Sequence, residues 1–214
     1  MKQANSVDAF LRILDQYKSD SEQYYRGQLE KYTTIPPSIA RDSGYAENEC
    51  KIYQEAITLG ATELEGLASP IEKLSKLQHY GIPTRLVDVT VDPLIALYFA
   101  VENADDSSPG NVFLYQIGGY PPDSEEVRVL SLLPTIDSLS IDSIASEFEK
   151  EFGYSITGDK ILSIVDSPVI MQRSDILQKS NPRLHKQKGT FLLCGNRVEG
   201  TINTIATIKN KAKS

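Results

Sequence analysis

The stretch LQHYGIPTRLVDVTVDPLIALYFAV, residues 77–101, decides how this chain folds. It places a histidine, an arginine, an aspartate and two threonines in front of a segment that is almost wholly apolar. Buried elements rarely lie beside so many polar groups unless a site needs them, because burying an unpaired polar group costs free energy. The stretch therefore predicts a functional site next to a buried helix.

Helix-boundary signals stand on both sides of these polar residues. SPIE at 69–72 has the pattern of a capping box with proline at the first helical position, and Gly81 suits a left-handed helix end. DP at 92–93 begins a second helix by the same logic. The polar groups of residues 82–91 are therefore expected to be held rigidly between two helices.

Composition bounds the class of protein. The chain has 214 residues, 40% hydrophobic and 24% charged, which suits one sizeable globular domain. Its net charge of −7 disfavours broad binding to nucleic acid. No apolar run is long enough to cross a bilayer and the N-terminus has no leader pattern, so we expect a cytoplasmic protein without a membrane partner. Two distant cysteines and no clustered ligands predict reduced thiols and no metal.

The rest of the chain mixes helical and extended patterns. We expect a single α+β domain in which helices pack on a mostly antiparallel core sheet. Residues 139–146 are polar and serine-rich, which is typical of a surface insertion. The expected helices cover residues 6–18, 48–59 and 144–152, and the expected strands cover 23–27, 112–117, 161–165, 189–194 and 201–208.

Arg26 stands in YYRGQ, in the middle of an apparent strand and directly before Gly27. A charged side chain in a sheet is costly unless it is paired, and a glycine lets a ligand or another backbone approach closely. The guanidinium grips phosphate or carboxylate through two parallel hydrogen bonds. Two interpretations stay open, a ligand-binding arginine and a structural ion pair with Asp88.

Alternation in an extended TRLVDVT segment places Asp88 and Thr90 on one face and Arg85 on the other. The two side chains on the shared face are then able to project into one cleft. The alternative is that Asp88 caps a turn. His79 lies in the last turn of its helix, where it serves either as a site residue or as an end-of-helix donor to backbone carbonyls.

Four blocks of the sequence resemble the FRG domain family, which is named for an aromatic-Arg-Gly motif. The resemblance spans residues 5–195, and implies that 196–214 form a C-terminal strand and a basic tail. The family is associated with bacteria and phages. The matching blocks are YYRGQ at 24–28, PPSIAR at 36–41, the stretch at 77–101, and NPRLHKQKGTFLLCG at 181–195.

A second similarity is to mono-ADP-ribosyltransferases. These enzymes carry Arg-Gly on the first core strand, and a Ser-Thr-Ser strand that leads into a helix with the pattern D-P-x-x-A-x-x-F-A. Here residues 88–90 take the Ser-Thr-Ser place, and residues 92–100 fit the helix pattern. The similarity implies an ADP-ribosyltransferase-like fold that uses NAD.

This similarity also implies roles for single residues. The guanidinium would bind a phosphate of NAD, the threonine would support the nicotinamide ribose, and a tyrosine would stack on the nicotinamide ring. The implied binding residues are Arg26, Gly27, Thr90, Tyr80 and Tyr98. The implied catalytic residues are Asp88, Gln187 and His79.

One departure from the transferase pattern bears on catalysis. Those enzymes use a glutamate on a late strand, whereas KQKGTFLL at 186–193 offers Gln187. An amide gives hydrogen bonds but not the negative charge that stabilises an oxocarbenium ion. Either Asp88 supplies that charge, or the chain binds NAD without turning it over. Glu199, beyond the strand, is a poor substitute.

We therefore expect an NAD-binding, ADP-ribosyltransferase-like enzyme that acts on a protein or nucleic-acid acceptor, in a toxin or phage-defence setting. The alternative is a non-catalytic module that senses a nucleotide or binds a protein. Nucleic-acid processing through the basic segment 179–188 fits the acidic composition less well.

Overall fold

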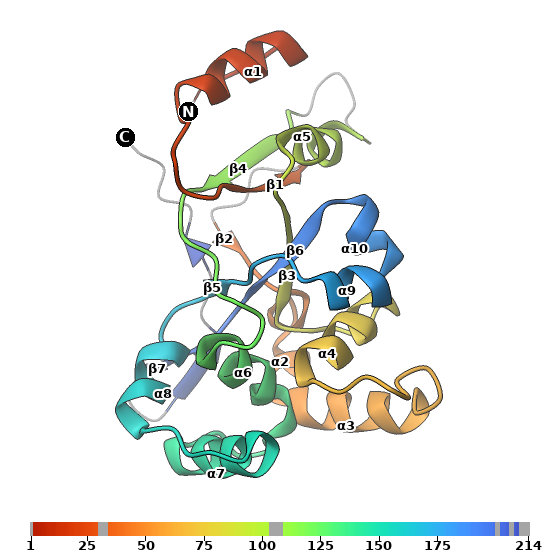
Figure 1. Ribbon diagram of the computed structural model, residues 1–214, viewed down its shortest axis with the longest axis vertical. Helices are drawn as coiled ribbons and strands as arrows, with labels where there is room; N and C mark the ends of the chain where they lie inside the picture. The colour runs from red at the N-terminus through yellow and green to blue at the C-terminus, as the bar shows by residue number, and fades with distance from the viewer. Residues whose placement is uncertain (1, 30–33, 103–108, 200–201, 206–207, 210–214) are drawn as a thin grey trace.

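The computed structural model describes residues 2–29, 34–102, 109–199, 202–205 and 208–209 (Figure 1). Lys211 and Lys213 of the expected basic tail lie outside the described residues, as do parts of the strand expected at 201–208. The longer helices are α1 (Val7–Asp15), α3 (Glu49–Leu59), α4 (Pro70–His79), α5 (Pro93–Val101), α6 (Glu125–Leu132), α7 (Ile141–Phe152) and α8 (Gly158–Val165). The short ones are α2 (Ser43–Glu47), α9 (Asp175–Ser180), α10 (Pro182–Lys186) and the 3-10 turns η1 (Ser38–Ala40) and η2 (Leu133–Thr135).

The core is a five-stranded antiparallel sheet with strand order β4-β1-β3-β6-β5. The expected α+β fold with a mostly antiparallel sheet is therefore confirmed. Its strands are β1 (Tyr24–Gln28), β3 (Leu86–Thr90), β4 (Asn111–Tyr115), β5 (Val169–Ile170) and β6 (Gly189–Leu193). Two separate ribbons pair β2 (Thr34–Ile35) with β9 (Ile208–Lys209) and β7 (Asn196–Glu199) with β8 (Ile202–Ile205).

The neighbouring strands of this sheet do not all pair along their whole length. β3 pairs with β6 along its whole length, and β1 pairs with β4 along its whole length. Between β1 and β3, by contrast, only Tyr25 and Thr90 are in register. Figure 1 shows β1 and β4 with α5 at one end of the molecule, while α3 and α7 lie at the other.

The predicted helix boundaries around the polar stretch are confirmed. Ser69 and Glu72 form a reciprocal capping box at the start of α4, and Gly81 has a left-handed φ of 83° just after its end. The carboxylate of Asp92 accepts a hydrogen bond from the backbone N–H of Leu94 at the start of α5. No helix among the described residues is long and apolar enough to cross a membrane.

Two expectations for the middle of the chain are wrong. Residues 161–165 belong to helix α8 and not to a strand, since a short apolar run does not distinguish a buried helix from a strand. Residues 139–146 are not a surface insertion, because α7 begins there behind the capping residue Ser140. Ile144 and Phe148 of α7 are buried in the main core.

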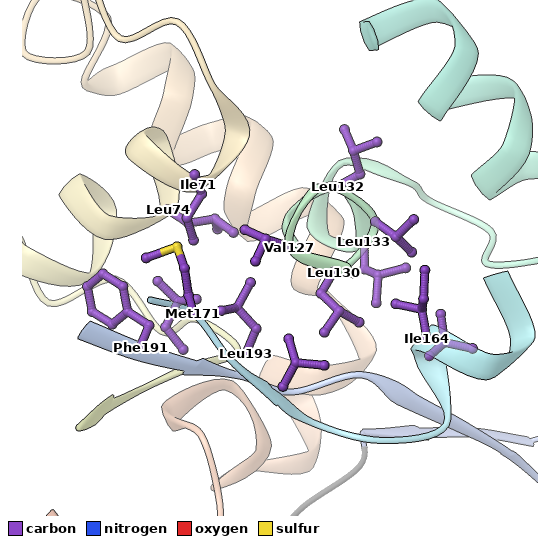
Figure 2. Packing of buried hydrophobic residues seen from close by; sticks show 14 of the residues in the cluster. Ile71, Leu74, Val127, Leu130, Leu132, Leu133, Ile164, Met171, Phe191 and Leu193 are labelled. Carbon is purple, nitrogen blue, oxygen red and sulfur yellow. The ribbon is translucent and has the colours of Figure 1, made fainter. Parts of the chain in front are cut away.

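The main core lies between one face of β3, β6 and β5 and the helices that cover it (Figure 2). The sheet contributes large side chains that point toward α4, α6 and α8, among them Phe191 and Leu193. Leu74 of α4, Leu130 of α6 and Ile164 of α8 pack against them. This layer fixes α4 over the sheet, and so fixes the polar residues at the end of α4.

Helix α5 packs on β1 through its small side chains. Ala96 and Ala100 are buried, while the larger Leu94, Tyr98 and Val101 stay exposed. The approach is close at Gly27 of β1, where an added Cβ would lie 1.7 Å from the carbonyl oxygen of Ala96. A larger residue at this position would push the helix away from the strand.

We predict that Gly27→Ala destabilises the fold by at least the roughly 1–3 kcal/mol typical of overpacking, since the obstructing atom belongs to the backbone. Urea denaturation monitored by circular dichroism measures the change. Gly118→Ala is the control, because an added Cβ there has no neighbour within 4 Å. Equal midpoints for the two variants would contradict the close packing.

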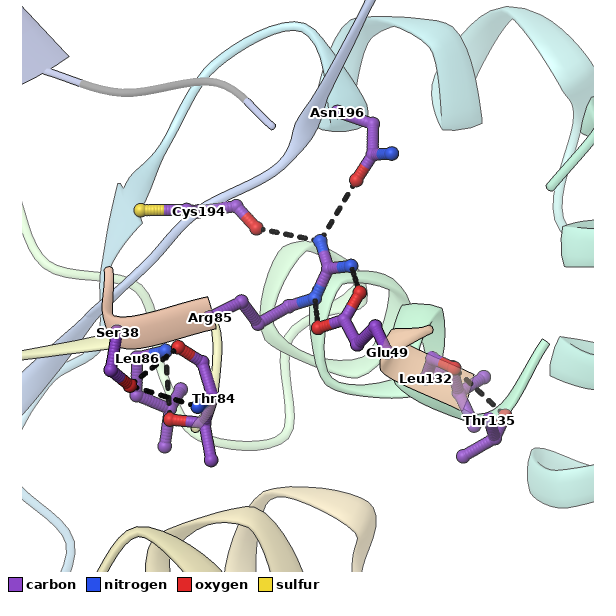
Figure 3. Close-up of polar contacts among 9 residues, drawn as sticks. All are labelled: Ser38, Glu49, Thr84, Arg85, Leu86, Leu132, Thr135, Cys194 and Asn196. Carbon is purple, nitrogen blue, oxygen red and sulfur yellow. Dashed lines mark hydrogen bonds and ion pairs between the residues drawn. The ribbon is translucent and has the colours of Figure 1, made fainter. Parts of the chain in front are cut away.

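A fully buried arginine joins several elements (Figure 3). Arg85, just before β3, grips the carboxylate of Glu49 on α3 through Nε, at 3.0 Å, and Nη2. Its Nη1 donates to the carbonyl oxygen of Cys194 at 3.0 Å and to Oδ1 of Asn196 at 2.9 Å. A buried charge of this kind is tolerated only when its donors are satisfied.

We predict that Glu49→Ala lowers the free energy of unfolding by about 3–5 kcal/mol, because it leaves the Arg85 guanidinium buried without a counter-charge. Urea titration followed by tyrosine fluorescence measures it. Asp8→Ala breaks the exposed ion pair with Arg12 and is expected to change stability by less than about 1 kcal/mol. Similar losses in both variants would refute the role given to the buried pair.

Candidate functional site

A small pocket opens where the end of α4, the middle of β3 and the α10–β6 connection meet. It encloses about 250 Å³, counting the open solvent at its mouth. Its lining combines one carboxylate with amides, a guanidinium, an imidazole and two apolar side chains. The lining residues are Ser75, Gln78, His79, Asp88, Asn181, Arg183, Leu184, Gln187 and Phe191.

The three predicted catalytic residues, His79, Asp88 and Gln187, all line this pocket. Each comes from a different element: the last position of α4, the centre of β3, and the C-cap of α10. The register of the sheet places Asp88 opposite Phe191 on β6, which lines the same pocket. Residues distant in sequence thus converge on one place.

Asp88 is the only carboxylate in the lining of this pocket. Its Oδ1 accepts a hydrogen bond from Nε2 of Gln78 at 2.9 Å. Burial raises the pKa of Asp88, although the nearby guanidinium groups of Arg26, Arg183 and Arg41 and the Gln78 hydrogen bond all oppose that rise. A carboxyl group with a perturbed pKa in a pocket is a candidate for acid–base or electrostatic catalysis.

Arg26 contacts β3 from the neighbouring strand and is not part of the pocket lining. Its Nη1 donates to the backbone carbonyl of Asp88 at 2.8 Å, in the region where β1 and β3 are no longer in register. Among the described residues it forms no carboxylate ion pair, so the open alternative of an Arg26–Asp88 side-chain pair is not what this geometry shows. Its Nε is buried without a hydrogen-bond partner, and burial lowers the pKa of the group.

The other predicted binding residues do not meet in the pocket. Thr90 is buried and donates to the carbonyl of Gln187 at 2.7 Å, which ties β3 to the segment before β6. Gly27 faces α5. Tyr80 is exposed next to His79, with ring centroids 5.7 Å apart. Tyr98 is exposed on α5, where its hydroxyl bonds Glu102.

Four polar residues of the pocket were not predicted from the sequence. Ser75 and Gln78 stand three residues apart on α4 and so share a helical face, a spacing that marks them once Asp88 is suspected. Asn181 donates to Oγ of Ser75 at 3.3 Å and accepts from the backbone N–H of Leu184. Arg183 follows on α10, with no side-chain hydrogen bond within the described part of the chain.

Within the described residues, no group of three His, Cys, Asp or Glu side chains lies close enough to hold an ion. Cys50 and Cys194 are free and buried, and burial raises the pKa of the Cys194 thiol to about 12. Neither thiol is suited to act as a nucleophile at neutral pH.

Comparison with known proteins finds one known domain in the chain. The model of the FRG domain matches residues 21–108, which include β1, α4, β3 and α5. The chain contains an FRG domain. No curated protein and no solved structure matches the chain.

The FRG match includes Gln78, His79 and Asp88, but the pocket is completed by residues from beyond it. Asn181, Arg183 and Gln187 all come from the segment before β6. The wider boundaries of 5–195 expected for the domain stay a prediction. Residues outside the matched segment nevertheless supply one wall of the candidate site.

We predict that Asp88→Asn makes the folded protein more stable at about pH 7, because the folded-state pKa of Asp88 is raised above the unfolded value of about 4. Folding shifts the equilibrium toward the protonated form relative to the unfolded chain, so wild type loses stability as pH rises through the folded-state pKa. The advantage of the variant must therefore shrink as pH falls toward about 4. Urea midpoints at both pH values measure it, and a gap of constant size would contradict the assignment.

Proposed function

We propose that this FRG domain binds NAD or a related nucleotide at the pocket and transfers ADP-ribose to a macromolecular acceptor. The observation that supports the proposal most is the convergence of His79, Asp88 and Gln187, from three separate segments, on one pocket. Arginine beside this set adds the positive charge that a phosphate-bearing ligand requires.

In this proposal Asp88 is the carboxylate that stabilises positive charge on the ribose as the bond to nicotinamide breaks. Nicotinamide leaves with the bonding electron pair, and a nucleophile of the acceptor attacks the ribose carbon. Such oxocarbenium-like states are stabilised by a nearby carboxylate. Gln187 offers amide hydrogen bonds to the ribose, and His79 lines the same pocket on the α4 side.

The size of the pocket limits how much of NAD it holds. Without the open solvent at its mouth its volume is about 20 Å³, room for about one water molecule, against roughly 300–1,000 Å³ for pockets that enclose a drug-sized ligand. The proposal is therefore that NAD lies across the mouth, with its nicotinamide ribose next to Asp88 and its pyrophosphate farther out. Arg183 is exposed there and forms no ion pair with a carboxylate of the described residues, so we assign it the phosphate contact. Arg26 is outside the pocket lining and donates Nη1 to the Asp88 carbonyl, so it is not given this contact.

Two observations favour a second candidate function, a module that senses a nucleotide without catalysis. Gln187 replaces the late-strand glutamate expected of a transferase. The raised pKa of Asp88 also reduces the fraction of the carboxylate form, and so reduces the negative charge available to a transition state. Binding and turnover must therefore be measured separately.

We predict that NAD or ADP-ribose raises the melting temperature of the protein, and that Arg183→Ala weakens binding by about 10–100-fold through loss of a charge-assisted hydrogen bond. Titration calorimetry measures the affinity. Lys179→Ala, which removes a nearby exposed charge outside the pocket, is expected to bind as wild type does.

Incubation with labelled NAD and cell extract then separates the two candidates. Transfer of label that disappears in Asp88→Asn supports the transferase, whereas binding without transfer supports the sensing module. No binding of NAD, ADP-ribose or nicotinamide by wild type would overturn both.

A further inference from the structure

A chain of three hydrogen bonds leads from the backbone of β3 to the carboxylate of Asp88. The N–H of Leu86 donates to Oγ1 of Thr84 at 3.2 Å. That hydroxyl donates to Oε1 of Gln78 at 2.7 Å, and Nε2 of Gln78 donates to Oδ1 of Asp88 at 2.9 Å. Turning any one of these groups toward bulk water would break the chain of hydrogen bonds.

Ser38 and Ile39 hold the backbone of Thr84, the second residue in this series of hydrogen bonds. Oγ of Ser38 accepts from the N–H of Thr84 at 2.9 Å and donates to its carbonyl oxygen at 3.1 Å (Figure 3). The N–H of Ile39 donates to the same carbonyl at 3.1 Å. The peptide groups on both sides of Thr84 are thereby held, and Thr84 itself is buried. Its hydroxyl therefore presents one constant orientation to Gln78.

The direction of the chain follows from counting hydrogens. A hydroxyl has one hydrogen, and because Thr84 already accepts from a backbone N–H, that hydrogen is available for Oε1 of Gln78. The amide nitrogen of Gln78 is then left facing Asp88, where it needs an acceptor. A carboxyl oxygen accepts in either protonation state, and the ionised form accepts more strongly, so this bond favours ionisation of Asp88. The reversed amide would leave the Thr84 hydrogen unused and would require a protonated acid.

We propose that Gln78 is a positioning residue, whose amide is oriented by Thr84 and holds Asp88 in the pocket as an ionised hydrogen-bond acceptor. The proposal concerns Asp88 in the ligand-free protein, and it rests on the proposed function only for the use made of that carboxylate. It explains how a partly buried carboxyl group stays available as a charged group despite the desolvation that opposes its ionisation.

Other charged or titratable side chains also lie near Asp88. Arg26 reaches its backbone from β1, Arg41 follows η1, and Arg183 and His79 stand on α10 and α4. None of these side chains forms a carboxylate ion pair with Asp88 among the described residues. The Gln78 amide is the one side-chain hydrogen bond that the described part of the chain gives to this carboxylate.

The test is a carboxyl-carbon NMR titration of Asp88 in the ligand-free, full-length protein, with Asp88→Asn used to assign the signal. Gln78→Met keeps the length of the side chain and removes both hydrogen bonds. We expect it to raise the pKa of Asp88 by about 1 or more, which is the value of a charge-assisted hydrogen bond. Thr84→Val, which removes only the orienting hydroxyl, is expected to raise it less, and Thr84→Ser to leave it near wild type.

Gln172→Ala, at an exposed glutamine outside the pocket, is the matched control and is expected to change nothing. An unchanged Asp88 pKa in folded Gln78→Met would overturn the proposal, as would equal values for Thr84→Val and Thr84→Ser. If Gln78→Met does not fold, the two Thr84 variants decide.

Calorimetry with NAD on the same variants separates this proposal from the proposed function. A raised Asp88 pKa in a protein that binds no nucleotide would leave the positioning role intact and overturn the nucleotide site. Nucleotide binding with an unmoved pKa would do the reverse.

Discussion

The buried guanidinium of Arg85 is the interaction on which the rest of the structure depends. Four hydrogen bonds from it reach α3, the residue after β6 and the start of β7, and they fix its own backbone N-terminal to β3. The strand that follows therefore begins at a set place and in a set register against β6. The position of Asp88 therefore depends on the ion pair that Arg85, three residues earlier, makes with Glu49.

Polar groups in this region are stabilised by one another and not by water. The backbone of Thr84 is held by Ser38, its side chain orients Gln78, and Gln78 contacts Asp88. Such networks are stable when every member is satisfied, and they specify one arrangement of the chain. The candidate site therefore combines a rigid frame with a carboxyl group whose pKa is raised by burial and lowered by the Gln78 hydrogen bond.

The sequence predicted the helix boundaries, which depend on local chemistry. The capping box at Ser69, the left-handed Gly81 and the cap at Asp92 are boundary signals that depend on a few neighbouring residues, and all three are confirmed. Alternation also assigned Asp88 to the correct face of its strand. The helix α8 was mistaken for a strand because five apolar residues carry no period of their own, and only packing against the core decides between the two.

The candidate site was predicted only in part, for a different reason. Asp88, His79 and Gln187 stand out because their residue types carry chemistry, and all three line the same pocket. Gln78 and Asn181 are ordinary polar residues whose importance arises from what lies opposite them. That Arg26 contacts a backbone carbonyl and not a carboxylate depends on the early separation of β1 from β3, which no pattern in YYRGQ encodes.

This separation has a mechanical consequence for the whole domain. Within the described residues, the backbone of the β1–β4 pair, with α5 on it, is in register with the β3–β6–β5 part of the sheet only at Tyr25 and Thr90, and the guanidinium of Arg26 adds a hydrogen bond to the Asp88 carbonyl. At the β1–β3 junction, a side chain thus donates a hydrogen bond of the kind that backbone amides donate elsewhere in the sheet. The remaining connection is made by side chains, through the packing of Tyr24 and Tyr115 against Val87 and Val89 and through the Lys188–Asp92 ion pair at the start of α5.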